Sequence, residues 1–158
     1  MSNPTYIATM SSAVGLLLSG YSLYIEYRIS SDPKYTTICE VYSAFDCRKP
    51  LSSSWSHPLS HFGAVDPSSK LDASLSSIAI TFYLVMLTYS LFGPYFGKYY
   101  LTLASTGAAV SIYLAYVAKV ILNVTCPICI AIYTVNFLLL GSVAVSEFNK
   151  TDRKPHSL

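Results

Sequence analysis

Residues 120–146, VILNVTCPICIAIYTVNFLLLGSVAVS, contain no Asp, Glu, Lys or Arg, and this stretch decides the fold class. About 20 apolar residues are enough to cross a bilayer as an α-helix. Three more uncharged runs precede it, at residues 2–25, 73–97 and 99–118. Because the four runs take up nearly two-thirds of the chain, the sequence predicts an all-α membrane protein built as a bundle of four transmembrane helices.

The composition of the whole chain agrees with this prediction. Of the 158 residues, 53% are hydrophobic and 11% are charged, whereas soluble domains carry about 25% charged residues. The formal net charge is +2 and no basic stripe is present, so we expect no nucleic-acid partner. No Lys or Arg precedes the first run, which is longer than the apolar core of a signal peptide, so we interpret it as a retained helix.

We expect a single domain, residues 1–158, in contact with membrane lipid. A long polar segment, residues 26–74, joins the first two membrane helices and holds two of the four cysteines. The transmembrane helices are predicted at residues 6–25, 75–92, 99–124 and 126–145, followed by a tail at residues 146–158.

The orientation follows from the helix count and from the basic residues. An even number of spans puts both termini on one side, and basic residues favour the cytoplasmic side of a membrane. The basic residues on the side of the termini are Lys98, Lys150, Arg153 and Lys154. We therefore expect a multi-pass protein of the endoplasmic reticulum membrane, with cytoplasmic termini and a lumenal segment 26–74. All four cysteines then face a compartment in which disulfides persist.

The motif Cys126-Pro127-Ile128-Cys129 indicates redox chemistry. Its two thiols are three positions apart at a helix start, where the helix N-terminus stabilises a thiolate. Pro127 suits the first helical turn because its missing N–H has no partner to lose there. Two alternatives remain, namely buried structural cysteines and one half of a zinc site. Cys39 and Cys47 are eight positions apart, so they do not form the usual second pair of closely spaced ligands. His57 and His61 have suitable spacing for such a pair and keep the zinc alternative open, but we favour redox use and expect no metal.

Tyr133 and Asn136 continue a polar stripe from Cys129 down the predicted last helix. Polar residues inside a membrane usually face the bundle interior. They can form hydrogen bonds between helices, or they can line a pocket for an apolar molecule with a carbonyl oxygen. A membrane quinone fits the second description.

Two features of segment 26–74 bear on the same chemistry. Cys39 and Cys47 bracket seven residues, and their spacing fits either a static disulfide or a mobile dithiol that passes electrons to Cys126 by thiol–disulfide exchange. Apolar residues also recur there at helical spacing, although Pro58 rules out one regular helix. They predict an amphipathic segment that lies over the mouth of the bundle, and they are Leu51, Trp55, Leu59 and Phe62.

The chain resembles the vitamin K epoxide reductase family over about residues 7–145. The resemblance rests on four helices, a long first loop with a Cys-x7-Cys pair, a later CxxC and a Tyr one turn beyond it. The matching stretches are Ile38-Cys39-Glu40 with Cys47, Ser52-Ser53-Ser54-Trp55, Phe62-Gly63, Phe82-Tyr83, Ser111-Ile112-Tyr113-Leu114-Ala115-Tyr116, and Cys126-Pro127-Ile128-Cys129-Ile130 with Tyr133 and Asn136.

The resemblance implies a reaction and a role for each cysteine. The family reduces vitamin K epoxide to the quinone, and the quinone to hydroquinone, with electrons from lumenal thiols. Carried over, Cys129 would be the thiolate that acts on the substrate and Cys126 its resolving partner. Cys47 would relay electrons to Cys126, and Cys39 would accept them from a thioredoxin-like lumenal protein.

The resemblance also implies a substrate pocket without a permanently bound cofactor. Tyr133 would donate a hydrogen bond to a substrate carbonyl, with Asn136 below it, and the cap over the pocket would comprise Leu51, Trp55 and Phe62. Family members that act on vitamin K carry an Asn near the start of helix 2, where this chain has Leu75. The fused thioredoxin domain of many bacterial relatives is not expected, so the electron donor would be a separate protein.

Two other functions compete with the reduction of vitamin K epoxide. The same residues would serve a quinone reductase whose main task is to form disulfides in lumenal proteins, and activity on the epoxide separates these two. A non-enzymatic four-helix scaffold with a disulfide-stapled loop is the third hypothesis. It predicts an inert disulfide between Cys39 and Cys47 and no role for the CxxC.

Overall fold

The computed structural model describes residues 4–32, 34–37, 45–61, 63–64, 66, 69 and 72–152. Every regular element in these ranges is helical, which confirms the predicted all-α class. The elements are α1 (Pro4–Ser31), α2 (Arg48–Ser52), η2 (Ser54–Ser56), α3 (Pro58–His61), α4 (Leu75–Leu87), α5 (Tyr89–Tyr116), the π-helix η3 (Val117–Ile121) and α6 (Pro127–Asp152).

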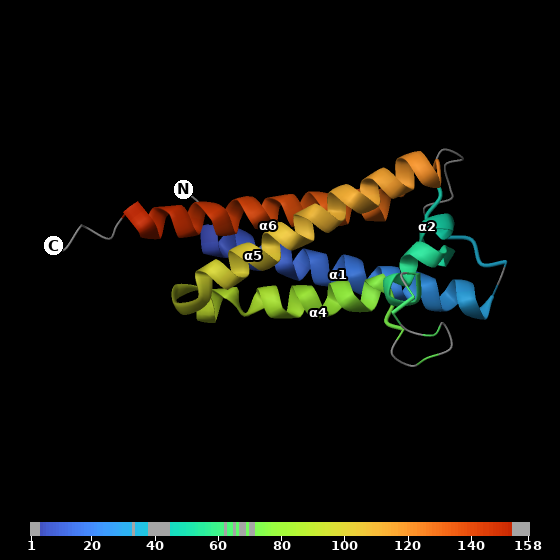
Figure 1. Cartoon of the computed structure of the whole chain (residues 1–158), viewed down its shortest axis with the longest axis horizontal. Coiled ribbons are helices and arrows are strands. Elements are labelled where there is room, and N and C mark those ends of the chain that lie inside the picture. The colour runs from blue at the N-terminus through green and yellow to red at the C-terminus, as the bar shows by residue number, and fades with distance from the viewer. Residues whose placement is uncertain are drawn as a thin grey trace.

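The four long helices run along the long axis of the molecule (Figure 1). Helix α1 packs against α4 and α6, and α5 packs mainly against α6. The short helices α2, η2 and α3 gather at one end of this bundle (Figure 1). They form the segment that we call the cap, residues 48–61. The start of α1 and the end of α6 lie at the opposite end.

Three helices are long and apolar enough to cross a membrane, over Pro4–Ser31, Tyr95–Ile121 and Pro127–Lys150. Helix α4 is also apolar, but its 13 residues fall short of the roughly 20 that a bilayer requires. The predicted span 75–92 is divided between α4 and the first turn of α5, because the helix is interrupted at Thr88. Helix length therefore supports three of the four predicted membrane spans.

The helix ends differ from the predicted spans in ways that have physical causes. Helix α1 continues through Glu26 and Arg28, and α6 continues past residue 145 to Asp152. Charged side chains near a helix end can reach water, so they do not end the helix where the apolar run ends. Residues 93–98, which separate the predicted spans 75–92 and 99–124, are helical apart from a kink at Phe96, where φ is −119° and ψ is 25°.

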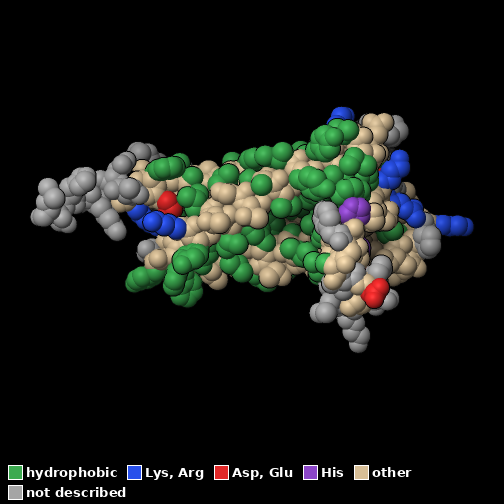
Figure 2. All heavy atoms as spheres, in the orientation of Figure 1, with side chains coloured by type: hydrophobic (Ala, Val, Ile, Leu, Met, Phe, Trp, Pro, Cys, Tyr) green, Lys and Arg blue, Asp and Glu red, His purple; other side chains and the backbone are tan. Residues whose placement is uncertain are grey.

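Apolar side chains fill the bundle and also cover its outside. The core cluster includes Tyr83, Met86, Tyr89, Leu139 and Val143, each at most 1% exposed. On the face shown in Figure 2, hydrophobic side chains cover the flank of the bundle, and Lys and Arg gather at its two ends. This distribution suits a protein that is surrounded by lipid along its flank.

Gly15 allows α1 and α4 to approach closely. A Cβ atom added at Gly15 would collide with the ring of Tyr83, which is fully buried. Gly20 lies on the same helix, and an added Cβ there would meet nothing within 4 Å.

We expect Gly15→Ala to destabilise the bundle by about 1–3 kcal/mol, because the added methyl group forces the Tyr83 ring to move in a packed interior. Thermal or SDS unfolding of the purified protein in detergent would measure this loss. Gly20→Ala is the matched control and should unfold at or above the wild-type temperature, because it replaces an exposed helical glycine by the best helix former. Equal effects of both substitutions would contradict this packing.

Candidate active site

A cavity of about 250 Å³ lies in the bundle beside the start of α6. Helices α4 and α5 form much of its wall, and α2 and η2 cover one end. Most of its lining is apolar, and its polar groups come from a few serines and from Trp55, Tyr83, Thr106, Cys129, Tyr133 and Asn136. The cavity therefore suits a largely apolar molecule with few hydrogen-bonding atoms.

Three of the four cysteines meet at this end of the bundle. The Sγ atom of Cys126 lies 2.7 Å from Sγ of Cys129 and 3.5 Å from Sγ of Cys47. Cys129 lines the cavity, whereas Cys126 and Cys47 are buried behind it. Cys126 and Cys129 are free thiols, and Cys47 is disulfide-bonded. Cys126 thus stands between the loop cysteine and the cysteine that faces the cavity.

The local backbone explains the position of Cys126. Asn123 adopts a left-handed conformation with φ of 51°, which Asn tolerates better than most residues. After this bend, Cys126 immediately precedes α6, and Pro127 is the first residue of the helix, as predicted. The backbone N–H of Cys129 donates to Sγ of Cys126 at 3.3 Å, so the sulfur accepts from an N–H that has no partner inside the helix.

The surroundings of Cys126 favour its thiolate. Cys126 precedes the membrane-spanning part of α6, which starts at Pro127. The hydrogen bond from the Cys129 thiol lowers the pKa of Cys126 most, and the backbone N–H groups of Cys129 and Ile128 act in the same direction. Burial and the negative charge of Asp46 oppose this shift, which remains downward overall. These contacts favour ionisation of Cys126.

Asp46 connects the loop to the CxxC motif. Its backbone N–H donates to the carbonyl of Thr125 at 3.1 Å, directly before Cys126. Its Oδ1 atom accepts from the backbone N–H groups of Arg48 and Lys49, at 2.9 and 3.0 Å, and so starts α2. These contacts hold Cys47 beside Cys126.

Tyr133 and Asn136 both line the cavity but have different surroundings. The hydroxyl of Tyr133 faces the thiol of Cys129, one turn earlier on α6. Asn136 is buried, with Oδ1 accepting from the Tyr83 hydroxyl at 2.7 Å and Nδ2 donating to Oγ of Ser111 at 2.8 Å. Asn136 therefore joins α4, α5 and α6, in agreement with the interhelical alternative.

Tyr83 and Ser111 are site residues whose role the sequence analysis missed. Both lie inside long apolar runs and line the cavity. Their sequence signals were polar atoms within predicted membrane helices and membership in two of the stretches that match the family, and neither signal gives a partner.

The structure places two of the three residues predicted for the cap beside the cavity. Leu51 of α2 and Trp55 of η2 line the cavity, and Pro58 starts α3, so the segment is broken into three short helices. Leu75 also lines the cavity. Cys39 and Phe62 lie outside the described residues. Among the described side chains, no group of three potential ligands could hold a metal ion.

The family model described as "Vitamin K epoxide reductase family" matches residues 6–144, nearly the whole chain. The chain belongs to the vitamin K epoxide reductase family. The mouse protein "Vitamin K epoxide reductase complex subunit 1" is 29% identical over 152 residues, which cover 92% of each chain. The rat protein of the same name is 30% identical over 140 residues, covering 84% of this chain and 85% of the relative.

Vitamin K epoxide reductase family membership fits the geometry of the site. Cys126 and Cys129 adjoin an apolar cavity, and the residues that surround them come from the matched range 6–144. Tyr133 lies one turn beyond the CxxC, and Leu75 stands in the cavity wall at the position where the resemblance implies an Asn in members that act on vitamin K.

We expect Asp46→Asn to shift the reactivity of Cys126 to lower pH, because it removes a negative charge that disfavours the thiolate and keeps the oxygen that starts α2. The rate at which Cys126 is alkylated by iodoacetamide would be followed from pH 5 to 10, with mass spectrometry of its peptide. In the wild type, the midpoint should already lie below the value of about 8.5 for an ordinary thiol. A midpoint that is unchanged or higher in the variant would contradict the assignment of the negative charge to Cys126.

Proposed function

We propose that this protein is a thiol-dependent membrane oxidoreductase that reduces vitamin K epoxide and vitamin K quinone. The observation that carries this proposal is the free Cys129 thiol in the wall of an apolar cavity, 2.7 Å from the free thiol of Cys126. Membership in the vitamin K epoxide reductase family supports a redox function of this type.

The cavity supports an apolar substrate that carries carbonyl oxygens. Its lining is mostly hydrophobic, and the Tyr133 hydroxyl lies beside the reactive thiol pair. In this arrangement Tyr133 would donate a hydrogen bond to a quinone oxygen, and Leu51 and Trp55 would cover the ring. The substrate supplies the oxidising group, so the proposal includes no permanently bound cofactor.

The reaction balances with the CxxC as the source of two electrons. Cys126 would take the proton from Cys129, and the Cys129 thiolate would attack the substrate. Attack by Cys126 on the Cys129 sulfur then forms their disulfide and releases the reduced product. With the quinone, the two electrons and one proton of the thiolate–thiol pair, with a second proton from water, yield the hydroquinone. With the epoxide, the same electrons and protons yield the quinone and one water.

The loop cysteines would restore the reduced pair. A free Cys47 thiol could attack Cys126 in the Cys126–Cys129 disulfide, because the two sulfurs lie only 3.5 Å apart. We propose that Cys39 receives electrons from a thioredoxin-like lumenal protein and passes them to Cys47. The observed combination of free Cys126 and Cys129 with oxidised Cys47 would then be the state that is ready to reduce substrate.

This mechanism requires a particular orientation in the membrane. We propose that the protein resides in the endoplasmic reticulum membrane with both termini in the cytoplasm. The cap would then lie in the lumen, because it sits at the opposite end of the bundle from the start of α1 and the end of α6 (Figure 1).

A second candidate function uses the same site for a different purpose. In a quinone reductase that chiefly forms disulfides in lumenal proteins, electrons also flow through the cysteines to a quinone. Leu75 favours this alternative, because a leucine in the cavity wall offers no hydrogen bond to an epoxide or a carbonyl oxygen. The scaffold hypothesis gives no reason for two free thiols beside an apolar cavity.

We expect the detergent-solubilised protein to reduce both vitamin K epoxide and vitamin K quinone when a small dithiol supplies electrons. Cys129→Ala should lower both rates at least about 100-fold, because it removes the thiol that acts on the substrate. Ile130→Ala is the matched control, since Ile130 is the next residue on α6 and is half exposed. The quinone and the hydroquinone would be quantified by chromatography.

The outcomes of this assay separate the candidate functions. Turnover of the quinone alone would favour the disulfide-forming quinone reductase. Activity that survives Cys129→Ala, or no activity on either substrate, would contradict the proposed chemistry.

A further inference from the structure

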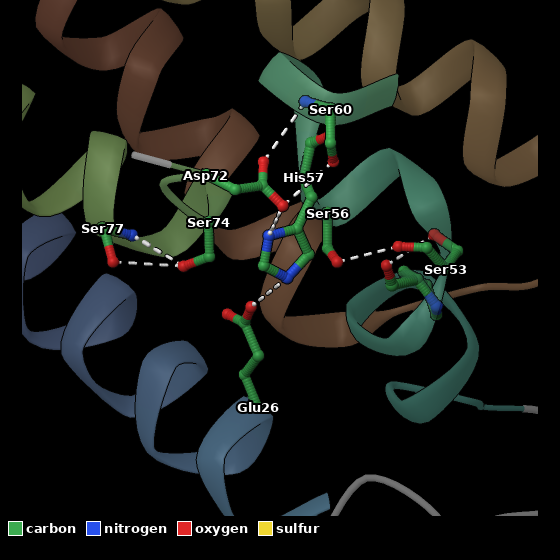
Figure 3. Close-up of polar contacts among 9 residues, drawn as sticks. Glu26, Ser53, Ser56, His57, Ser60, Asp72, Ser74 and Ser77 are labelled. Atoms are coloured by element: carbon green, nitrogen blue, oxygen red, sulfur yellow. Dashed lines mark hydrogen bonds and ion pairs between the residues drawn. The ribbon is translucent and has the colours of Figure 1, made fainter. Parts of the chain in front are cut away.

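A cluster of three titratable side chains lies at the cap, apart from the cysteines. Glu26 comes from α1, His57 joins η2 to α3, and Asp72 precedes α4 (Figure 3). Nε2 of His57 lies 3.4 Å from Oε1 of Glu26, and its Nδ1 lies 3.1 Å from Oδ2 of Asp72. The imidazole thus bridges two carboxylates from two different parts of the chain.

Both carboxylates face a positive charge only when His57 carries a proton on both ring nitrogens. A neutral imidazole has one N–H and one lone pair, so one of the two carboxylates would face a lone pair. The imidazolium carries a positive charge within ion-pair distance of both acids, although Nδ1 forms no hydrogen bond in this geometry. The Glu26 and Asp72 side chains are only 12% and 8% exposed, whereas His57 is 38% exposed. Loss of the proton would therefore leave two largely buried carboxylates without their shared cation.

The cluster attaches the cap to the bundle on two sides. Glu26 holds His57 to α1, and the hydroxyls of Ser74 and Ser76 lie beside the same carboxylate at the start of α4. Asp72 also accepts from the backbone N–H and the hydroxyl of Ser60, at 3.2 and 3.0 Å. One histidine therefore connects η2, α3, α1 and the segment that leads into α4.

The cap residues that precede His57 face the cavity. Trp55 and Ser56 line it, as does Ser76 beside Glu26. The Trp55 ring lies between His61, at 4.0 Å between ring centroids, and Tyr113 of α5, at 6.0 Å. Movement of His57 away from α1 would carry Trp55 away from the cavity, because only Ser56 separates them in the chain.

We propose that Glu26 and Asp72, acting through protonated His57, hold the cap (residues 48–61) closed over the cavity, and that deprotonation of His57 loosens it. His57 is then a positioning residue that makes retention of the substrate depend on pH. The identity of the substrate rests on the function proposed above, whereas the closure of the cap does not.

Other charged and titratable groups near the cap have different neighbours. His61 of α3 stacks on Trp55, and Arg28 of α1 lies over the ring of Tyr35, 4.9 Å from its centroid. Lys49 of α2 pairs with Asp46 at 3.6 Å. Within the described residues, the charged partners that face His57 are therefore Glu26 and Asp72.

Trp55 allows a direct test, because it is the only tryptophan in the chain. Quenching of its fluorescence by acrylamide would be measured in lipid nanodiscs between pH 5 and 8.5, the range in which histidine side chains change charge. All proteins would carry His61→Gln, so that protonation of the stacked His61 does not itself alter the emission. We expect the quenching constant to rise roughly twofold across this range, as an opening cap exposes the indole.

Three further substitutions decide whether His57 causes the change. His57→Gln should give high quenching at every pH, because glutamine carries no positive charge. His57→Arg should restore low quenching at every pH, because a guanidinium keeps its charge and can donate to both carboxylates. Asp72→Asn keeps the shape of its side chain and should flatten the pH dependence, so it tests the same idea if His57→Gln fails to fold.

A pH dependence that persists in both His57→Gln and Asp72→Asn, or a quenching constant that is flat with pH in the reference protein, would overturn the proposal. No substrate or turnover enters this measurement, so its failure is distinct from failure of the proposed function. Where the reductase activity is present, KM for the quinone should rise with pH in the reference protein and lose that rise in Asp72→Asn. The pH profile of kcat, which follows the cysteines, should be the same in both proteins.

Discussion

The contact of Cys126 with two other sulfurs is the constraint on which the rest of the site depends. One neighbour, Cys129, belongs to the first turn of α6 and faces the cavity, and the other, Cys47, belongs to the polar segment between α1 and α4. The backbone hydrogen bond from Asp46 to Thr125 keeps these segments together. In the proposed relay, electrons that enter the polar segment would have a short path through this junction to the thiol that faces the cavity.

The cavity beside this junction exists because a few polar side chains fix the helices around it. Tyr83, Asn136 and Ser111 join α4, α6 and α5 by hydrogen bonds in an apolar interior. Each of these side chains also faces the cavity, so the network shapes the wall without filling the space. At the other end of the cavity, His57 and its two carboxylates attach the cap.

The sequence predicted the features of the fold that depend on residues close together in the chain, namely the helical regions and the start of α6. Uncharged runs located the four long helical regions, and Pro127 marked the start of α6, because proline lacks the N–H that a first turn leaves unused. Pro58 indicated a break in the polar segment, and the structure places it at the start of α3. The break at Thr88 and the length of α6 depend on packing and on polar contacts near the helix ends. Glu26 and His57 are far apart in the chain, so their pairing could not be read from a single sequence.

The central claim is that Cys126 lies between the loop and the cavity. The most direct test is whether Cys47 and Cys126 form a disulfide when their other partners are removed. Peptide mapping by mass spectrometry under non-reducing conditions would be applied to a variant with Cys39→Ala and Cys129→Ala, and to a matched variant with Cys39→Ala and Cys126→Ala. We predict a Cys47–Cys126 disulfide in the first variant and little linkage of Cys47 to Cys129 in the second. Free, separately alkylated Cys47 and Cys126 in the first variant, or efficient linkage in the second, would contradict the account.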